Sequence, residues 1–427
     1  TTEIYTLSLH DALPIFYIAK SDIHGNWLWA QNVGGTNSDY GMGITIDTDD
    51  NCFVTGYFSG SVNFGGTTLT SSGGNDVFVA KLDSSGNWLW AKKAGGPSID
   101  EGFGISADSF GNCYLTGRFF GTASFGGTSI TSSGSPDIYV AKLNGDGNWQ
   151  WVIKAGGAGF DQSNGICTDP EGGCYVTGYF QGTADFGSIT FTSSGYADIF
   201  ISKLDSNGNW IWVKQAGATG WDEGFGIATD ASGNCYVTGT FQASCTFGDT
   251  TLTSGGSDNT FVVKLDTNGN WLWVSQVYGA SSNIGYSIAV ELDETCYVTG
   301  SFKNSATFGS NSISSFGEND IYVSKLNSNG NWLWAKQGGG TDDDLGNSIA
   351  LDSNGYCYVT GHISSAATFG DVSLTNNGSW DIFIAKIGEG VSNEDIVSPS
   401  ASFTLKGNYP NPFSTQTFIK YEVTKHS

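Results

Sequence analysis

Short apolar runs alternate with polar turns rich in Gly and Asn along most of the chain, and this pattern predicts strands and turns only. In one representative stretch we expect strands at residues 102–107, 113–117, 137–143 and 149–154. The turn at 108–112 has the form Asp-x-x-Gly-Asn, in which Asp and Asn bond their own backbone and Gly accepts a positive φ. The apolar runs do not alternate strictly with polar residues, as expected of strands buried on both faces.

This four-strand unit repeats at a fixed interval. The first tryptophan of an Asn-Trp-x-Trp motif recurs every 61 residues, at Trp27, Trp88, Trp149, Trp210, Trp271 and Trp332. The same interval separates six cysteines, at Cys52, Cys113, Cys174, Cys235, Cys296 and Cys357. Radial repetition of four-stranded antiparallel sheets is typical of a β-propeller. A β-solenoid is the alternative, but its coils usually repeat in far fewer residues. We therefore predict an all-β fold, a β-propeller of four-stranded antiparallel blades.

Two further features refine this architecture. An extra stretch between the second and third strands, such as residues 119–135, is expected to form a small added hairpin. The first two strands of the blade occur six times in the sequence, whereas the third occurs seven times. Seven blades is the simplest total, with the first and last blades incomplete in this chain.

The repeated motifs resemble a known family. Asp-Ile-Tyr-Val-Ala-Lys-Leu (137–143), Gly-Asn-Trp-x-Trp and Gly-Asn-Cys-Tyr-Leu-Thr-Gly (111–117) are similar to the seven-bladed β-propeller repeat, SBBP type, of secreted bacterial proteins. The resemblance covers residues 16–388. It implies a propeller fold and a secreted or outer-surface location, and it supplies no catalytic residues.

Both ends of the chain depart from the repeat. Residues 1–15 fit none of its columns and resemble a sequencing adapter translated in frame, so we expect them to be foreign to a metagenomic fragment. Residues 389–402 form a short polar linker. Residues 403–427 resemble the start of a C-terminal sorting domain of type IX secretion, cut short, through the motif Asn408, Tyr409, Pro410, Asn411, Pro412 and Phe413. The alternative is a Pro-rich turn before an edge strand at 417–423.

Composition excludes several kinds of partner. The net charge of −24, from 41 acidic and 17 basic residues, argues against nucleic-acid binding. No apolar run is long enough for a transmembrane helix, so we expect no membrane insertion, and we expect a monomer. Blades pack about 10 Å apart, beyond the Cα separation of a disulfide, so the cysteine column is predicted to hold buried free thiols. Cys167 and Cys174 could instead face each other across a hairpin.

An acidic column precedes the first strand of most copies: Asp39, Asp100, Asp161, Asp222 and Asp344, with Asn283 in the remaining copy, the fifth along the chain. In a propeller this position surrounds the central channel. Like charges in a ring repel unless a cation bridges them, so calcium is one interpretation. The other is that each aspartate caps its own turn. No other cofactor is expected. A second column includes Asp47-x-Asp49-x-Asn51, which has the odd spacing of a calcium loop but lacks the glycine and distal glutamate of an EF-hand.

Histidine is too scarce for common hydrolytic or zinc chemistry. Only four are present, and His362, the one inside a blade, is expected in a loop. Aromatic residues are better candidates for a binding site. The residue before the acidic column varies between copies, and variation on a fixed frame is how repeat proteins make binding surfaces. Phe160 and Trp221 in that column, with Tyr40, could stack on a sugar or anchor a protein. The paired tryptophans could do the same, but packing between blades explains their recurrence better.

Three functions follow from these observations. The first is a non-catalytic binding or display scaffold outside the cell, whose ligand is a glycan or a protein. The second is a propeller-type polysaccharide lyase or glycosidase that uses channel carboxylates. The enzyme hypothesis needs two carboxylates in unlike environments, so that their pKa values differ, whereas a symmetric ring gives its carboxylates like environments. The third is a structural spacer within a larger surface protein.

Overall fold

The computed structural model describes residues 3–8, 15–388, 403–409 and 418–423. The chain divides into two compact units, Thr1–Ile387 and Gly388–Ser427. In the part of the chain that is described, no helix has the length and apolarity needed to cross a membrane.

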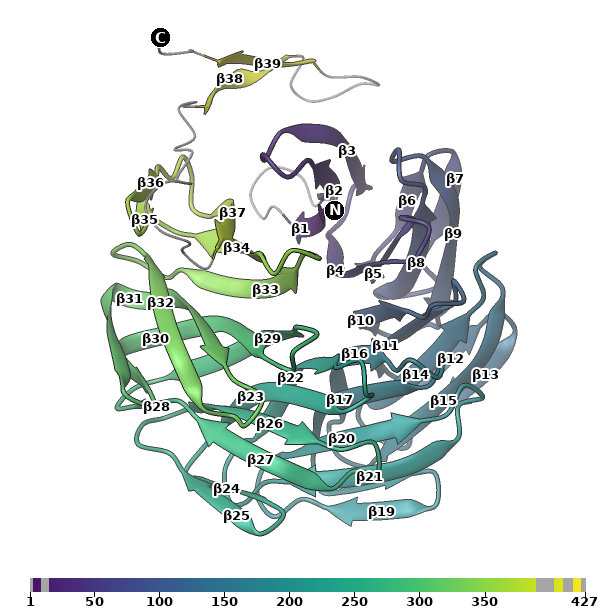
Figure 1. Cartoon of the computed structure of the whole chain (residues 1–427). Coiled ribbons are helices and arrows are strands. Elements are labelled where there is room, and N and C mark those ends of the chain that lie inside the picture. The colour runs from purple at the N-terminus through teal and green to yellow at the C-terminus, as the bar shows by residue number, and fades with distance from the viewer. Residues whose placement is uncertain (1–2, 9–14, 389–402, 410–417, 424–427) are drawn as a thin grey trace. The chain divides into compact units, whose positions relative to one another are not determined.

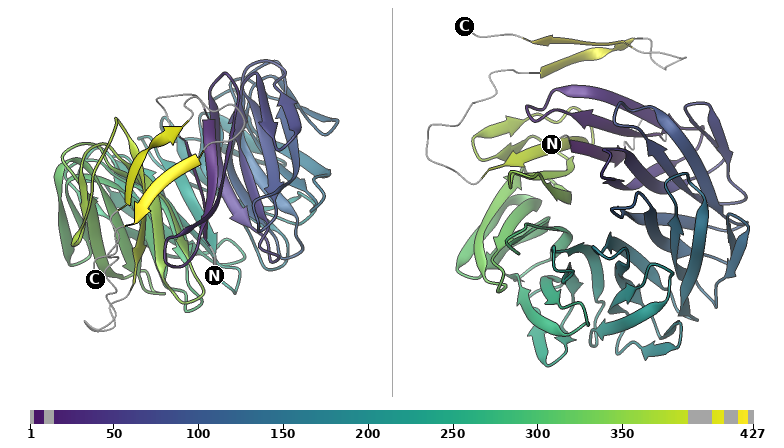
Figure 2. Two further views of the ribbon diagram at one scale, coloured as in Figure 1. Left: turned by 90° about the horizontal axis from the view of Figure 1, so that it is seen from above. Right: turned by 45° about the vertical axis from the view of Figure 1, so that its right-hand side comes forward.

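The first unit consists of antiparallel sheets that follow one another in sequence order around a common centre (Figures 1 and 2). One sheet contains, in spatial order, β10 (Asp100–Ala107), β11 (Cys113–Phe119), β14 (Asp137–Leu143) and β15 (Trp149–Gly157). The first strand lies innermost, as the labels of β10, β16 and β22 in Figure 1 show. These strands extend the predicted ones by only a few residues, because the Asp-x-x-Gly-Asn turn closes each hairpin where expected.

Four further sheets have the same four-strand order, so that five complete blades are present among the described residues. They are β4 (Asp39–Ile46), β5 (Cys52–Phe58), β8 (Asp76–Leu82) and β9 (Trp88–Gly95); β16 (Gln162–Thr168), β17 (Cys174–Phe180), β20 (Asp198–Leu204) and β21 (Trp210–Ala216); β22 (Glu223–Thr229), β23 (Cys235–Phe241), β26 (Asn259–Leu265) and β27 (Trp271–Gln276); and β29 (Asn283–Val290), β30 (Cys296–Phe308), β31 (Asn311–Leu326) and β32 (Trp332–Gly339). The prediction of four-stranded antiparallel blades is confirmed.

A three-stranded sheet stands at each end of the repeat. The first contains β1 (Glu3–Ser8), β2 (Ile15–Ser21) and β3 (Trp27–Gly34), and the last contains β33 (Leu345–Leu351), β34 (Cys357–Ile363) and β37 (Asp381–Ile387). The strand β1 falls within the segment expected to be foreign and pairs with β2.

The second unit contains one antiparallel pair, β38 (Phe403–Tyr409) with β39 (Phe418–Val423). Asn408 and Tyr409 of the expected sorting motif lie in β38. Pro410, Asn411, Pro412 and Phe413, and the linker at 389–402, lie outside the described residues.

The predicted extra hairpin is confirmed, and it links neighbouring blades. In the second complete blade it is formed by β12 (Thr122–Phe125) and β13 (Thr128–Thr131), and β12 pairs with β9 of the preceding blade. The other hairpins are β6 (Ser61–Phe64) with β7 (Thr67–Thr70), β18 (Thr183–Phe186) with β19 (Ile189–Thr192), β24 (Ser244–Phe247) with β25 (Thr250–Thr253), and β35 (Ala367–Phe369) with β36 (Val372–Leu374). In the remaining copy the hairpin continues β30 and β31, and β30 pairs with β28 (Tyr278–Gly279).

The core lies between successive blades. One cluster joins Phe53 and Val79 of one blade to Cys113, Leu115 and Tyr139 of the next. All six cysteines of the repeated column are fully buried, and none of the eight described cysteines forms a disulfide. Cys167 lies opposite Tyr175 in the ladder, not opposite Cys174. Neighbouring residues of a strand point to opposite faces, so these two thiols belong to different blade interfaces.

The paired tryptophans serve packing between elements. In five of the six copies the first tryptophan of the pair stacks edge-on against a hairpin phenylalanine, as Trp149 does against Phe125 at 5.3 Å between ring centroids. The second reaches the next blade, where the indole N–H of Trp90 donates to the Gly145 carbonyl at 3.0 Å. This agrees with the packing interpretation of the motif.

Candidate functional site

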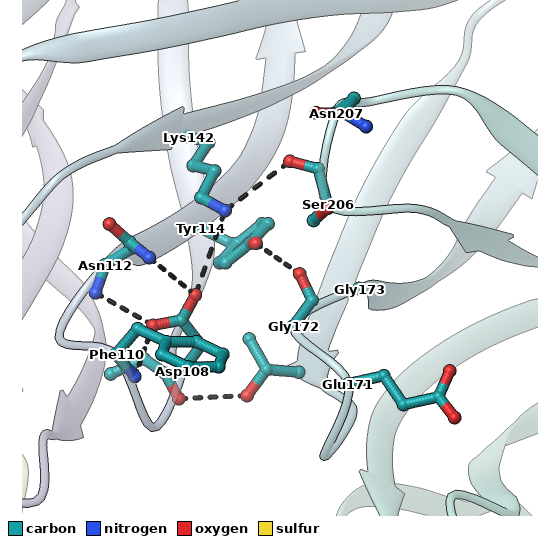
Figure 3. Close-up of polar contacts among 12 residues, drawn as sticks. Asp108, Phe110, Asn112, Tyr114, Lys142, Glu171, Gly172, Gly173, Ser206 and Asn207 are labelled. Atoms are coloured by element: carbon teal, nitrogen blue, oxygen red, sulfur yellow. Dashed lines mark hydrogen bonds and ion pairs between the residues drawn. The ribbon is translucent and has the colours of Figure 1, made fainter.

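The acidic turns that follow the first strands hold a buried lysine head group (Figure 3). Asp108 accepts the backbone N–H of Phe110 and of Asn112, both at 2.9 Å, through Oδ1. Its Oδ2 lies 3.8 Å from the ammonium of Lys142, which also sits 4.6 Å from the centroid of the Tyr114 ring. In the equivalent turn with the spacing of a calcium loop, Lys81 lies 3.0 Å from Asp47. A side-chain cation therefore neutralises the turn carboxylate.

The same cluster connects one blade to the next. The hydroxyl of Tyr114 donates to the carbonyl of Gly172, in the equivalent turn of the following blade, at 2.5 Å (Figure 3). Tyr175 makes the same bond to Gly233 at 2.7 Å. These residues are structural, and they explain why the turn at this end of each blade varies little.

The acidic column in front of the first strands is buried. Asp100 Oδ2 accepts the N–H of Gly96 at 2.7 Å, and its Oδ1 accepts the N–H of Phe120 at 3.2 Å. One or both of these backbone bonds recur at Asp39, Asp161, Asp222 and Asp344. Each carboxylate thus closes the loop before its own strand, as the turn-capping interpretation requires.

Each member of this column stands at the start of, or directly before, the first strand of a different sheet. Among the residues that the structure describes, no three His, Cys, Asp or Glu side chains are grouped so that they could hold a metal ion. The calcium interpretation of Asp39, Asp100, Asp161, Asp222 and Asp344 therefore rests on the sequence alone.

The three aromatic candidates do come together. They belong to a series of ring contacts that runs across neighbouring blades along the first two strands and the loops before them. We call this series the aromatic track, and it comprises Tyr40, Tyr57, Phe103, Phe160, Tyr179 and Trp221, with Arg118 between Phe103 and Phe160. At one end, Tyr40 lies 4.8 Å from Tyr57, and Tyr57 lies 6.5 Å from Phe103, measured between ring centroids.

The middle of the aromatic track is held by a cation between two rings. The guanidinium carbon of Arg118 lies 5.5 Å from the centroid of Phe103 and 5.2 Å from that of Phe160. Phe160 stacks on Tyr179 at 6.1 Å with an interplanar angle of 5°, and Tyr179 lies 5.7 Å from Trp221. All members except Tyr179 are half-buried, so each keeps part of its surface for a ligand.

Polar groups lie beside these rings. Arg118, which is the only arginine in the sequence, donates to Glu101 Oε2 through Nε at 2.8 Å and Nη2 at 2.6 Å. Its Nη1 donates to Gln162 Oε1 at 2.7 Å. The indole N–H of Trp221 donates to Glu223. These bonds fix the orientation of Arg118 and of the Trp221 ring before any ligand arrives.

The two glutamates have unlike surroundings. Glu101 is ion-paired with Arg118, whereas burial raises the pKa of Glu223 to about 7, with a further rise from Asp258. They stand at the first strands of blades that are not neighbours, because β16 lies between β10 and β22. A glycosidase needs its two carboxylates within about 10 Å, on either side of one bond.

The sequence predicted Phe160, Trp221 and Tyr40 but neither Phe103 nor the second-strand members of the track. A signal was available, since the position two residues after the conserved Thr of Cys-(Tyr/Phe)-(Val/Leu)-Thr-Gly also varies. It holds Tyr57, Arg118, Tyr179, Thr240, Ser301 and His362. His362 lies in β34 and not in the expected loop, with its ring stacked on Trp380 at 4.8 Å.

Comparisons with known proteins agree with the fold. The family model described as a β-propeller repeat, SBBP, matches residues 211–240 and 333–366. An uncharacterized WD repeat-containing protein, L264, of Acanthamoeba polyphaga mimivirus is 23% identical over 89% of this chain and 33% of its own length. The regulatory protein FlaEY of Caulobacter vibrioides is 26% identical over 43% of this chain and 20% of its own length. The chain thus spans a third or less of these relatives.

Two solved structures match the chain with low TM-scores. A Bacteroides caccae protein of unknown function matches 68% of this chain and 80% of its own, with a TM-score of 0.35 and 12% identity. YCF48 bound to D1 peptide matches 87% of this chain and 86% of its own, with a TM-score of 0.38 and 11% identity. The five four-stranded blades show that the chain folds as a β-propeller, and two stretches of it match the SBBP β-propeller repeat.

Proposed function

We propose that this protein is a non-catalytic binding scaffold and that the aromatic track takes its ligand, a carbohydrate chain. One observation carries the proposal: Tyr40, Phe160 and Trp221 come from separate blades and join one series of rings with Arg118. Aromatic faces match the apolar faces of sugar rings, while nearby planar polar groups can bond hydroxyls. A series that crosses several blades suits an elongated ligand better than a compact one.

The absence of a catalytic role is part of the proposal. Glu101 and Glu223 are separated by a blade, and Glu101 is already paired with Arg118. A lyase or glycosidase would be the alternative if both could reach one bond. We also propose that the scaffold needs no cofactor and acts as a monomer.

The setting is a proposal of the same kind. Motifs of secreted SBBP proteins and the Asn-Tyr-Pro-Asn-Pro-Phe string support secretion or display at the outer surface through the type IX machinery. Seven copies of the third strand, β2, β8, β14, β20, β26, β31 and β37, support seven blades in the intact protein. A spacer role within a larger surface protein remains compatible with both features, but it assigns no purpose to the aromatic track.

Binding and product release should be measured together. The full chain is titrated with a panel of soluble polysaccharides by calorimetry, with and without calcium, and the supernatants are assayed for new reducing ends and unsaturated products. We expect binding without products, independent of calcium. Release of soluble products would contradict the scaffold function and favour the enzyme. If no glycan binds and a protein binds instead, the carbohydrate ligand is rejected.

Side-chain variants locate the site. Trp221→Ala and Phe160→Ala should each weaken binding about 10-fold or more, since buried aromatic contacts are worth about 2 kcal/mol in binding. Phe110→Ala is the control, because Phe110 is 73% exposed in the turn at the other end of β10. Equal loss in all three variants would contradict the assignment of the aromatic track.

A further inference from the structure

Two buried aspartates meet at each of four junctions between blades. One is the first residue of a third strand, or for Asp320 the equivalent position within the longer β31, and the other is the turn-capping aspartate of the next blade. The pairs are Asp76 with Asp100, Asp137 with Asp161, Asp198 with Asp222, and Asp320 with Asp344, and all eight are at most 1% exposed. A Cβ atom added to Gly95 would lie 2.9 Å from Asp76 Oδ1 and 3.0 Å from Asp100 Oδ2. At Gly156 the distances to Asp137 Oδ1 and Asp161 Oδ2 would be 3.0 and 2.7 Å. At these two junctions the carboxyl groups thus border the same small space. At the other two, the backbone N–H of Asp222 and of Asp344 donates to the residue just before the partner aspartate, at 3.0 and 2.7 Å.

One oxygen in most pairs has no partner. Asp76 Oδ2 accepts the N–H of Ser72 at 3.0 Å and lies 3.2 Å from the ammonium of Lys93. Asp76 Oδ1 is buried without a hydrogen bond, as are the Oδ1 atoms of Asp137 and Asp320. A buried acceptor without a donor is costly, and two ionised carboxylates in contact repel each other. The site therefore lacks a positive group or a proton between the two aspartates.

A fifth junction indicates whether the missing group is a cation or a proton. There both aspartates are replaced together, by Asn259 and Asn283, which are also buried. Two atoms at this junction have no partner, the donor Nδ2 of Asn259 and the acceptor Oδ1 of Asn283. The third-strand residue thus offers a proton, and the first-strand residue offers an acceptor. An amide pair carries this donor and this acceptor without any ion, although the two atoms are not hydrogen-bonded to each other in the structure.

We propose that each aspartate pair holds one proton, carried by the third-strand carboxyl group and shared with the carboxylate of the next blade. An Oδ1–H on Asp76 then donates to Asp100 in the way that the amide of Asn259 can donate to Asn283. Calcium fits this space less well, because it takes six or more oxygen ligands and the asparagine pair carries no charge to bind it.

The electrostatics agree with a shared proton. Burial raises the pKa of Asp100, Asp222 and Asp320 to about 7, and the partner aspartate adds to the rise in each case. For Asp161, burial raises the pKa to about 6, with an addition from Asp137. Several other charged or titratable groups face these pairs: Lys93, Glu101 and Tyr139 at the first, Lys154 and Tyr179 at the second, Cys245 at the third, and Asp342 and Asp343 at the fourth.

The pair Asp198–Asp222 gives the sharpest test, because no lysine balances it. Gln215 Nε2 donates to Asp198 Oδ2 at 2.6 Å in place of the lysines at Asp76 and Asp137. Asp198→Asn supplies a permanent donor where we place the proton. The full-length variant is unfolded with urea between about pH 5 and about pH 8, and the slope of stability against pH counts the protons bound on folding.

The wild-type midpoint should fall as pH rises through this range, because the folded chain then loses protons that the unfolded chain does not hold. In Asp198→Asn the slope of stability against pH should correspond to about one proton fewer bound on folding. The infrared band of protonated carboxyl groups near pH 6 should also weaken. Asp249→Asn changes an exposed turn aspartate and should leave the slope unchanged.

The reverse variant adds a pair. Asn259→Asp with Asn283→Asp should take up about one more proton on folding, and it should lose stability at about pH 8 while folding normally near pH 5. Equal slopes in wild type and both variants would overturn the proposal. So would a calcium-dependent rise of the wild-type midpoint at about pH 8 that is lost in Asp198→Asn with Asp222→Asn, since that result assigns the space to a cation.

Discussion

Each complete blade buries a lysine head group against an acidic residue of a turn. Lys203 lies 3.2 Å from Asp169 Oδ2, with side-chain exposures of 9% and 3%, and 5.0 Å from the centroid of Tyr175. A buried ion pair often contributes little compared with an apolar replacement of both partners. Removing one partner is different, because the remaining charge stays buried and unpaired.

We therefore expect Lys203→Met to lower the free energy of unfolding by about 3 kcal/mol, in line with the loss of one partner from a buried pair. The measurement is urea unfolding followed by tryptophan fluorescence. Lys336→Met is the control, because Lys336 is exposed on the outer strand β32. A loss no larger than in the control would mean that water reaches Asp169 and screens it.

The added hairpins act as links between strands of adjacent blades. Phe125 at the end of β12 is 1% exposed and contacts Tyr139 at 4.8 Å and Trp149 at 5.3 Å, while its backbone pairs with Ala94 of β9. One side chain thus touches the third and fourth strands of its own blade, and its backbone touches the outer strand of the blade before. This explains why a phenylalanine recurs at this position in every copy.

Phe125→Ala should lower the free energy of unfolding by about 3–5 kcal/mol, the usual cost of such a truncation in a core. It should also increase amide hydrogen exchange in β9 and in the β12–β13 hairpin, where the link is lost. Phe110→Ala, which removes an exposed ring of the same size, should change stability by less than about 0.5 kcal/mol. Increased exchange spread evenly over all blades would show that the hairpin is not a local link.

Over the whole chain, sequence periodicity was sufficient to predict blades, hairpins and the packing role of the tryptophans. The binding candidates were found only where copies differ in front of the first strand, as with Phe160 and Trp221. Arg118 and Tyr179 were missed because they follow a motif that recurs in every copy and looks structural. The partner of Asp76 is Asp100, 24 residues further on in another blade, and only the arrangement of sheets reveals that contact. Whether Cys167 faces Cys174 likewise depends on the register of the two strands. Cys167 lies opposite Tyr175, one residue beyond Cys174, and a motif cannot predict that register.

The pH profile of the whole molecule combines two groups of aspartates with opposite signs. Hydrogen bonds from Asn87 to Asp83 and from Asn26 to Asp22 lower the pKa of these turn carboxyls, so the stability they give is present above about pH 4 and is lost as pH falls. Burial raises the pKa of Asp100, Asp222 and Asp320 to about 7, so the stability linked to the proton of each aspartate pair is lost as pH rises from about 4 to about 7. The net charge of −24 adds repulsion on the alkaline side.

We expect the melting temperature to be highest near pH 5 and to fall toward pH 8. The fall should be smaller in salt of about 0.5 M, because salt screens the surface repulsion but not the buried groups. Scanning calorimetry in matched buffers over this pH range measures the melting temperature. A maximum of the melting temperature near pH 8 would contradict the raised pKa of the buried aspartates.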